Sequence, residues 1–146
     1  MKKYDGTLIA SYLVLEKKGK ILLLRRFNTG WHDGDYSLIA GHVKRGESAL
    51  QAVVREAKEE AGVVVQEKGV DFVHIAHRNK TKDNNGYIDF YFKTKKWQGE
   101  IKMGESCDRL DWFSPNKLPN NIIPVVSEIL REISEGSRYS EYGWIK

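Results

Sequence analysis

One segment constrains the fold of this chain more than any other: residues 41–63, which read GHVKRGESALQAVVREAKEEAGV. Between residues 48 and 61 the apolar side chains recur at helical spacing, and Gly62 is placed to end a helix, because glycine readily adopts the left-handed conformation of a C-terminal cap. Three glutamates of this stretch lie at the first, fourth and fifth positions of one helical turn and so share a face: Glu56, Glu59 and Glu60. The segment therefore predicts an amphipathic helix with one apolar side and one strongly acidic side.

Apolar runs on both sides of this helix predict a sheet. Residues 7–15 and 20–25 are separated by Lys-Lys-Gly, a pattern typical of a hairpin. Further strands are expected where β-branched and aromatic residues gather, at 36–40, 63–66, 71–78, 87–97 and 109–113. A second amphipathic helix is expected at about 124–135, packed on the sheet. No repeat or linker interrupts the pattern, so we expect one α/β domain over residues 1–146 with a mixed sheet.

Composition and charge argue against several classes of protein. Cys107 is the only cysteine, so no internal disulfide can form, and a reducing, cytoplasmic setting is expected. No stretch approaches the roughly 18 apolar residues that would cross a bilayer, so membrane association is not expected. The net charge of +4 favours anionic partners, but the lysines are spread along the chain, which argues against a nucleic-acid tract.

The acidic face has two interpretations when it is considered alone. Like charges three and four residues apart on a helix repel, at a cost of a few tenths of a kcal/mol per pair. Most surface helices mix charges of both signs, whereas converging carboxylates suit Mg²⁺, which binds oxygen ligands. REAKEE by itself still favours a solvated surface.

The residues around the acidic face reverse this balance. They follow a fixed pattern: a glycine, five residues, a glutamate, seven residues, then Arg-Glu-U-x-Glu-Glu-x-Gly-U, where U is a bulky aliphatic residue. The seven fixed positions are occupied by Gly41, Glu47, Arg55, Glu56, Glu59, Glu60 and Gly62. Such a coincidence arises by chance in about one in 10⁵ or fewer chains of this length. The segment resembles the signature of the Nudix hydrolases, and the resemblance continues in ILLLRR, in the W-x-G-E of 97–100 and in LDWF.

This resemblance implies the Nudix fold, an α/β/α sandwich around a mixed β-sheet with a loop-helix-loop metal site. It implies hydrolysis of a nucleoside diphosphate linked to another group, with Mg²⁺ or Mn²⁺ as cofactor. The implied metal ligands are the carboxylates of Glu56, Glu59 and Glu60 and the backbone carbonyl of Ala40. The sequence departs from the family at Ala57, where a larger aliphatic residue is usual, and at Ile39-Ala40-Gly41, where many members have Pro-Gly-Gly.

Further roles within this signature segment, the Nudix box of residues 41–63, follow from the same resemblance. The catalytic set is expected to contain Glu59, Glu60 and Arg55, one carboxylate taking a proton from the attacking water. Arg55 lies next to Glu56 but on another face, and is expected to pair with Glu47 and hold the loop against the helix. Gly41, Glu47 and Gly62 are expected to be structural.

Candidates outside the box come from three loops and one strand. Glu105 is a candidate catalytic base in a flexible loop between two strands, and Glu100 is its weaker competitor. Arg25 and Arg26 end a strand, where neighbours face opposite sides, so only one of them can reach a phosphate, and Arg26 is preferred. Asn121, with Asn120, suits either a purine edge or a helix cap. Trp31 is a candidate for stacking on a base.

Three functions agree with these residues. The leading hypothesis is a pyrophosphohydrolase of nucleoside triphosphates, standard or oxidised, because a short chain has little besides the core fold with which to bind longer substrates. The alternatives are removal of a 5′ pyrophosphate from RNA and a catalytically silent nucleotide-binding module. The resemblance also favours a homodimer over a monomer.

Overall fold

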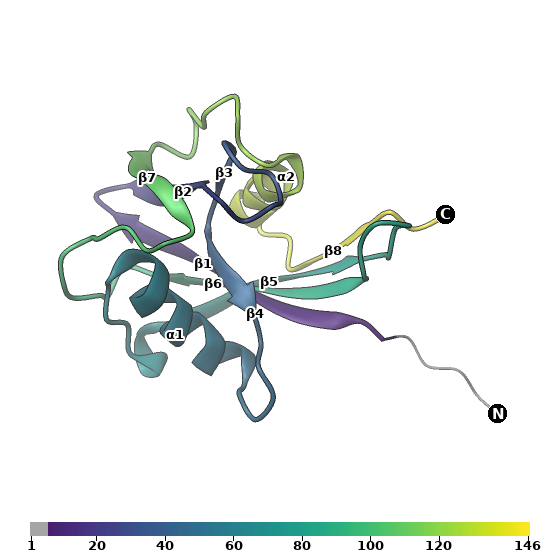
Figure 1. The fold of residues 1–146 in the computed structure, drawn as a ribbon, viewed down its shortest axis with the longest axis horizontal. Coiled ribbons are helices and arrows are strands. Elements are labelled where there is room, and N and C mark those ends of the chain that lie inside the picture. The colour runs from purple at the N-terminus through teal and green to yellow at the C-terminus, as the bar shows by residue number, and fades with distance from the viewer. Residues whose placement is uncertain (1–5) are drawn as a thin grey trace.

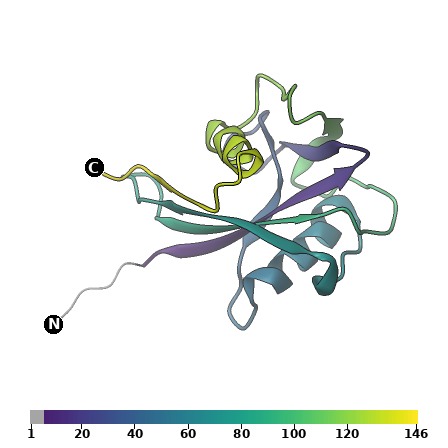
Figure 2. The same ribbon diagram turned by 180° about the vertical axis from the view of Figure 1, so that it is seen from behind.

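The computed structural model describes residues 6–146 and contains one mixed sheet. Its strands are β1 (Leu8–Lys17), β2 (Lys20–Arg26), β3 (Tyr36–Ser37), β4 (Ile39–His42), β5 (Asp71–Arg78), β6 (Tyr87–Thr94), β7 (Cys107–Phe113) and β8 (Tyr139–Tyr142). Two α-helices, α1 (Ala49–Ala61) and α2 (Pro124–Ser134), cover opposite faces of the sheet (Figures 1 and 2), and η1 (Glu67–Gly69) is a single 3₁₀ turn. The expected α/β/α arrangement is therefore present.

The strand order explains where the site forms. The main path runs β3-β2-β1-β6-β5-β8, while β4 pairs with β1 and β7 pairs with β2. β1 pairs in parallel with β6 from Leu8 to Leu15, and its other edge is shared between β4 near its start and β2 near its end. Because β4 and β2 take different parts of one edge, they diverge beside β1, and the segments that follow them frame an opening.

Alternation along the strands divides the core into two layers. In β1, Tyr12 and Val14 belong to the cluster beneath α2, whereas Leu13 and Leu15 belong to the cluster beneath α1. Successive strand residues point to opposite faces, so a strand covered by helices on both sides is apolar almost without interruption. This is the reason why β1 reads as a continuous apolar run.

Helix α1 has a signal at each end, and the one at Gly62 was expected from the sequence. Ser48 caps its N-terminus through a capping box with Gln51, and Gly62 follows its C-terminus in the left-handed conformation with φ 72°. Ala57 is fully buried, so the residue that departs from the family pattern lies in the core beneath the helix. The acidic face is thereby turned toward β4 and the opening beside β1.

Two expectations about secondary structure need correction, and one segment without an expectation forms a strand. Residues 63–66 do not form a strand: Val64 makes one isolated bridge with Gln98, although Val63 and Val65 are buried as strand residues would be. The strand expected at 87–97 ends at Thr94. The C-terminal segment 138–146, RYSEYGWIK, for which no structure was predicted, contains β8, which pairs in parallel with β5. Burial was readable from the sequence in these segments, but pairing depends on distant partners.

Candidate active site

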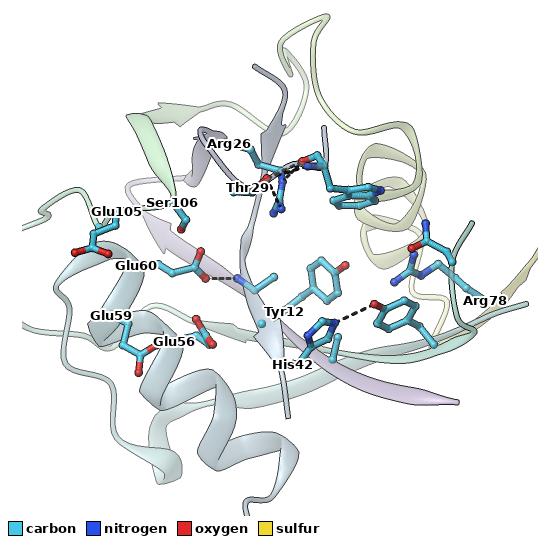
Figure 3. A pocket seen from close by; sticks show the side chains of 17 residues that line it. Tyr12, Arg26, Thr29, His42, Glu56, Glu59, Glu60, Arg78, Glu105 and Ser106 are labelled. Atoms are coloured by element: carbon cyan, nitrogen blue, oxygen red, sulfur yellow. Dashed lines mark hydrogen bonds between the residues drawn. The ribbon is translucent and has the colours of Figure 1, made fainter. Parts of the chain in front are cut away.

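A cavity of about 870 Å³ opens where α1, β1 and β4 meet the loops after β2 and before β7 (Figure 3). Its lining comes from eight separate stretches of the chain. The residues are Ala10, Tyr12, Arg26, Thr29, Trp31, Ala40, Gly41, His42, Glu56, Glu59, Glu60, Arg78, Asn84, Tyr87, Gly104, Glu105 and Ser106. All three glutamates predicted as metal ligands line it, together with Ala40 and Glu105.

Four carboxylates lie at one end of the cavity: Glu56, Glu59 and Glu60 from α1, and Glu105 from the loop before β7. The carboxyl group of Glu60 has a strongly raised pKa. Its burial raises the pKa of the carboxyl group to about 8, the nearby carboxylate of Glu56 adds to the rise, and a hydrogen bond from the Ala40 N–H opposes it. Burial beside Glu56 therefore disfavours the charged form of Glu60, and a positive group would have to compensate for that charge.

The donor set at this end suits a hard divalent cation. Among residues 6–146, no three His, Cys, Asp or Glu side chains stand together as a finished metal cage. Glu60 Oε1 accepts the Ala40 N–H at 2.9 Å, and Glu56 Oε1 accepts Arg55 Nη1 at 2.7 Å, so both oxygens are engaged. Mg²⁺ keeps several waters and needs only one or two protein carboxylates beside substrate phosphates, so a finished cage is not required. A cation would also offset the burial and, to a lesser degree, the charge of Glu56, which together raise the pKa of Glu60.

The backbone of Ala40 faces the same end. Ala40 is opposite Tyr12 in the antiparallel ladder between β4 and β1, and its N–H is directed at Glu60 instead of at β1. In such a ladder the N–H and C=O of one residue point the same way, so the carbonyl of Ala40 is also turned away from β1. Alanine in place of the family's usual glycine therefore leaves this oxygen free to act as a ligand.

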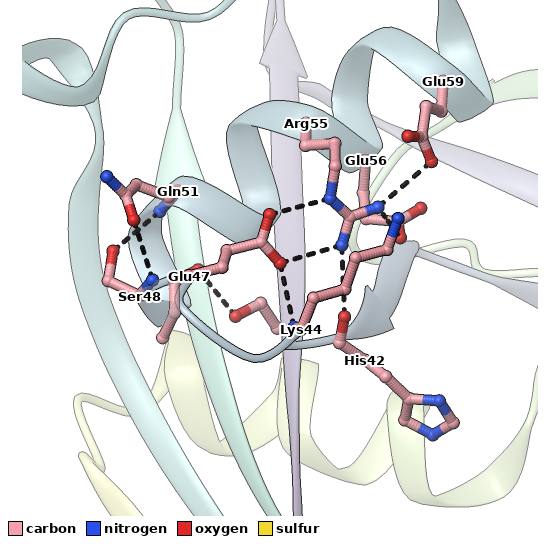
Figure 4. A network of polar contacts seen from close by, with 10 residues as sticks. His42, Lys44, Glu47, Ser48, Gln51, Arg55, Glu56 and Glu59 are labelled. Carbon is pink, nitrogen blue, oxygen red and sulfur yellow. Dashed lines mark hydrogen bonds and ion pairs between the residues drawn. The ribbon is translucent and has the colours of Figure 1, made fainter.

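Arg55 organises the loop and the acidic face together (Figure 4). Its guanidinium donates to both oxygens of Glu47, at 2.8 and 3.0 Å, which is the predicted pair. The same group also donates to Glu56 at 2.7 Å, to Glu59 at 3.1 Å and to the His42 carbonyl at 3.2 Å. The sequence placed Arg55 on another face of the helix than Glu56. Its long side chain nevertheless reaches Glu56 and Glu59 of the acidic face as well as Glu47 of the loop.

This network affects the protonation of Glu47. The hydrogen bonds from Arg55, and then the one from the Lys44 N–H, lower the pKa of Glu47 to about 2. The carboxylates around Arg55 correspondingly raise the pKa of its guanidinium. Glu47 is therefore an anion at any ordinary pH, and its negative charge keeps the arginine in place behind the acidic face.

Gly41 makes room for one of the glutamates. A Cβ atom at this position would lie 2.2 Å from Glu56 Oε1 and 2.3 Å from its Cδ. Both distances are far below any real carbon contact, so a larger residue would displace the carboxylate. The structural role predicted for Gly41 thus has a specific cause, the space that Glu56 occupies.

The side chains of the two arginines at the end of β2 point to opposite faces of the sheet, as expected for neighbours on a strand. Arg26 lines the cavity, where its guanidinium donates to the Trp31 carbonyl at 2.7 Å and to Thr29 Oγ1 at 2.9 Å, and stacks over the Trp31 ring. Arg25 points elsewhere and forms a two-bond pair with Asp108, at 2.7 and 2.9 Å. Arg25 is therefore removed from the candidate substrate-binding residues, because its charge is already neutralised outside the cavity.

Asn121 also lies outside the lining of the cavity. Its side-chain amide donates to the Gly34 carbonyl at 2.8 Å, which ties the start of the α2 segment to the loop after β2. The helix-cap alternative is wrong too, since the N-cap of α2 is Ile123 and no side chain caps it. In this structure Asn121 supports the loop that carries Trp31.

Glu105 and Glu100 differ in position. Glu105 is exposed and lines the cavity beside the α1 glutamates, whereas Glu100 is exposed outside the lining. Their loop is less free than its glycines suggested: Lys102 donates through its N–H to the Ala61 carbonyl, and Gly104 likewise to the Glu60 carbonyl. The loop is fastened along the end of α1, which brings Glu105 to the acidic face.

The other half of the cavity was missed from the sequence. It contains Tyr12, His42, Arg78, Asn84 and Tyr87. Stacking and hydrogen bonding join several of them: His42 Nε2 lies 2.9 Å from the Tyr87 hydroxyl, and the Arg78 guanidinium lies 4.4 Å from the centre of the Tyr87 ring. No local pattern marks these residues, because they come together only through the pairing of β1, β4, β5 and β6.

Comparison with known proteins shows to which family the chain belongs. The family model described as NUDIX domain matches residues 7–133. The chain belongs to the Nudix family. Nudix hydrolases generally use divalent metals and act on small nucleotides, in agreement with an acidic pocket of this kind.

Relatives and solved structures show the range of Nudix proteins that this chain resembles. It is 35% identical over 107 residues to an ADP-ribose pyrophosphatase of Methanocaldococcus jannaschii, covering 73% of this chain and 61% of that protein. It is 33% identical over 124 residues to the NAD-capped RNA hydrolase NudC of Pseudomonas aeruginosa, covering 84% and 41% respectively. The chain thus spans less than two thirds of the length of these curated relatives.

The fold also matches that of a solved Nudix structure over most of the chain. The crystal structure of a MutT NUDIX hydrolase from Burkholderia pseudomallei aligns with a TM-score of 0.79 at 20% identity, covering 87% of this chain and 98% of that one. Within residues 6–146, no helix is long and apolar enough to cross a membrane.

Proposed function

We propose that this chain is a metal-dependent pyrophosphohydrolase that cleaves the diphosphate of a nucleoside diphosphate derivative, with ADP-ribose as the leading substrate type. One observation carries the proposal: a single cavity joins four carboxylates at one end to an arginine and several aromatic residues farther along. The first end suits metal-bridged phosphates, and the rest suits a nucleoside.

The relatives favour the substrate type. One is named for ADP-ribose and the other for NAD-capped RNA, and both compounds contain adenosine diphosphate joined to a second ribose. This common group replaces the nucleoside triphosphate that the sequence alone favoured. NAD-capped RNA is a second candidate, supported by the name of the NudC relative and by the basic pI of about 9.1.

In this proposal Glu56, Glu59, Glu60 and the Ala40 carbonyl hold the metal, which we take to be Mg²⁺, with Mn²⁺ as a substitute. A bound divalent cation supplies positive charge for the phosphate oxygens and lowers the pKa of water. Arg26 forms no ion pair with a carboxylate among residues 6–146, so its charge is available to a phosphate of the substrate.

The remaining roles concern position and proton transfer. Arg55 acts as a positioning residue, because with Glu47 it sets the places of Glu56 and Glu59. Glu105 accepts the proton of the attacking water, since it is exposed to the cavity and has no ion-pair partner among the described residues. If Glu105 is not the base, this role passes to one of the three helix glutamates.

A substrate panel tests the proposal. Purified protein is incubated with ADP-ribose, NAD, dGTP, 5′-triphosphate RNA and NAD-capped RNA, with Mg²⁺, with Mn²⁺ or with a chelator, and products are separated by anion-exchange chromatography. We expect metal-dependent conversion of ADP-ribose to AMP and ribose 5-phosphate, and none by the isosteric control Glu59→Gln. Preferred turnover of dGTP would restore the triphosphate hypothesis, and steep loss of RNA turnover with salt would identify RNA as the substrate. No turnover of any compound by folded protein would refute the proposal.

A further inference from the structure

Two tyrosines lie face to face on the α2 side of the sheet. Tyr12 of β1 is opposite Tyr91 of β6 in the parallel ladder, with ring centres 4.5 Å apart and ring planes within 5°. Both are enclosed, with 7% of Tyr12 and 0% of Tyr91 exposed. Neither hydroxyl has a hydrogen-bond partner among residues 6–146. A hydroxyl sealed from solvent without a partner, as that of Tyr91 is, normally costs stability.

The surroundings of the two hydroxyls differ. The Tyr91 oxygen is sealed from solvent, whereas Tyr12 lines the cavity. Figure 3 shows the Tyr12 ring between the helix glutamates and Arg78, with its hydroxyl in the open space of the pocket. A ligand in the cavity can therefore supply the partner that Tyr12 lacks.

Charge determines what kind of partner this is. Burial, and then the charge of Asp89, raise the pKa of Tyr12 well above its ordinary value, so the hydroxyl keeps its proton. A phenolic hydroxyl that keeps its proton can donate a hydrogen bond. The positive charges of Arg78 and Arg26, which line the same pocket, lower the pKa of Tyr12 but do not cancel the rise. The partner that suits the Tyr12 hydroxyl is therefore a ligand atom that accepts a hydrogen bond.

We infer that the Tyr12 hydroxyl donates a hydrogen bond to an acceptor atom on the nucleoside half of the substrate, which makes Tyr12 a specificity-determining residue. The inference rests on the proposed function, since phosphates held at the glutamate end would direct the attached nucleoside past Tyr12 toward Arg78.

The stacked pair offers a matched experiment. Tyr12→Phe and Tyr91→Phe each remove one unpartnered hydroxyl and keep the ring, but only the first changes the cavity. Binding is measured by calorimetry in Mg²⁺ with two kinds of probe: inorganic pyrophosphate for the phosphate end, and AMP, GMP, CMP and UMP for the nucleoside end. Direct binding does not depend on turnover, so the result is separate from that of the substrate panel.

We expect Tyr12→Phe to bind the tightest of the four monophosphates about threefold to tenfold more weakly than wild type, the effect of losing one neutral hydrogen bond. Its affinity for pyrophosphate should not change, and Tyr91→Phe should match wild type with both probes. Neither variant should melt at a lower temperature than wild type, since neither hydroxyl is bonded within the described chain; a lower melting temperature for Tyr12→Phe would indicate a structural role.

Three results would overturn the inference. The first is equal affinity of wild type, Tyr12→Phe and Tyr91→Phe for the monophosphate. The second is a loss confined to pyrophosphate, which would place the hydroxyl on a phosphate. The third is a wild-type protein, folded and with Mg²⁺ present, that binds none of the monophosphates. Hydrolysis of ADP-ribose together with the first result would refute the role of Tyr12 alone and leave the proposed function standing.

Discussion

Replacing Gly41 by alanine should separate activity from stability. The added Cβ would lie 2.2 Å from Glu56 Oε1, and real Cβ contacts essentially never fall under 3.0 Å. The carboxylate must therefore move by at least about 0.8 Å, the difference between these two distances. The group that moves is the end of a flexible side chain, and Gly41 does not have a positive φ, so neither backbone strain nor core packing is affected.

The size of each effect follows from what Glu56 contacts. Its bond to Arg55 is weakened or lost, and partly exposed ion pairs of this kind contribute about 0.2 to 1 kcal/mol, so the free energy of unfolding should fall by no more than about 1 kcal/mol. A misplacement of about 1 Å at a catalytic site can lower the rate about 100-fold. We therefore expect turnover to fall by about two orders of magnitude with a small change in melting temperature.

The assay combines turnover as a function of metal concentration with thermal unfolding. Gly6→Ala is the control, because its added Cβ would meet nothing within 4 Å. In the Glu56→Ala background, Gly41→Ala should cause little further loss, since the atom with which it collides is gone. Full activity in Gly41→Ala would refute the reasoning, and so would a large loss of stability with the same rate per folded molecule.

Four further predictions follow from the site. Glu59→Gln and Glu60→Gln should each lower turnover by orders of magnitude while the circular dichroism spectrum is kept, and near-normal turnover in both would exclude a catalytic role for the acidic face. Glu105→Gln should lower turnover at least tenfold, about 1.4 kcal/mol in barrier height, and Glu100→Gln much less; equal small effects would return the base to the helix glutamates. Hydrogen bonds from Arg55 depress the pKa of Glu47 from 4.5 to about 2. The stability that this pair contributes should therefore be complete above about pH 4.5 and be lost as the pH falls toward 2. In unfolding experiments, Glu47→Gln should remove that part of the acid dependence. Sedimentation at micromolar concentration should show a monomer or a dimer, and a larger assembly would contradict this.

The box helix could be predicted in detail because its signals are local. The apolar spacing and the stop at Gly62 act within one or two helical turns, and the shared face of the glutamates follows from helix geometry alone. The same holds for the alternation that separates Arg25 from Arg26. Strand geometry showed that only one of them could face the site, but not which side of the sheet the site would occupy.

The sequence by itself determined the family, the two helices, most strands and the acidic end of the pocket. Tertiary structure alone decided the other end, because Tyr12, Arg78 and Tyr87 lie on three strands and meet only after β1 pairs with β6 and β6 with β5. It also decided that Asn121 supports a loop and that the tail becomes β8. A helix brings together residues three or four positions apart, whereas a sheet joins residues whose separation along the chain is set by the whole topology, and short-range patterns do not encode that separation.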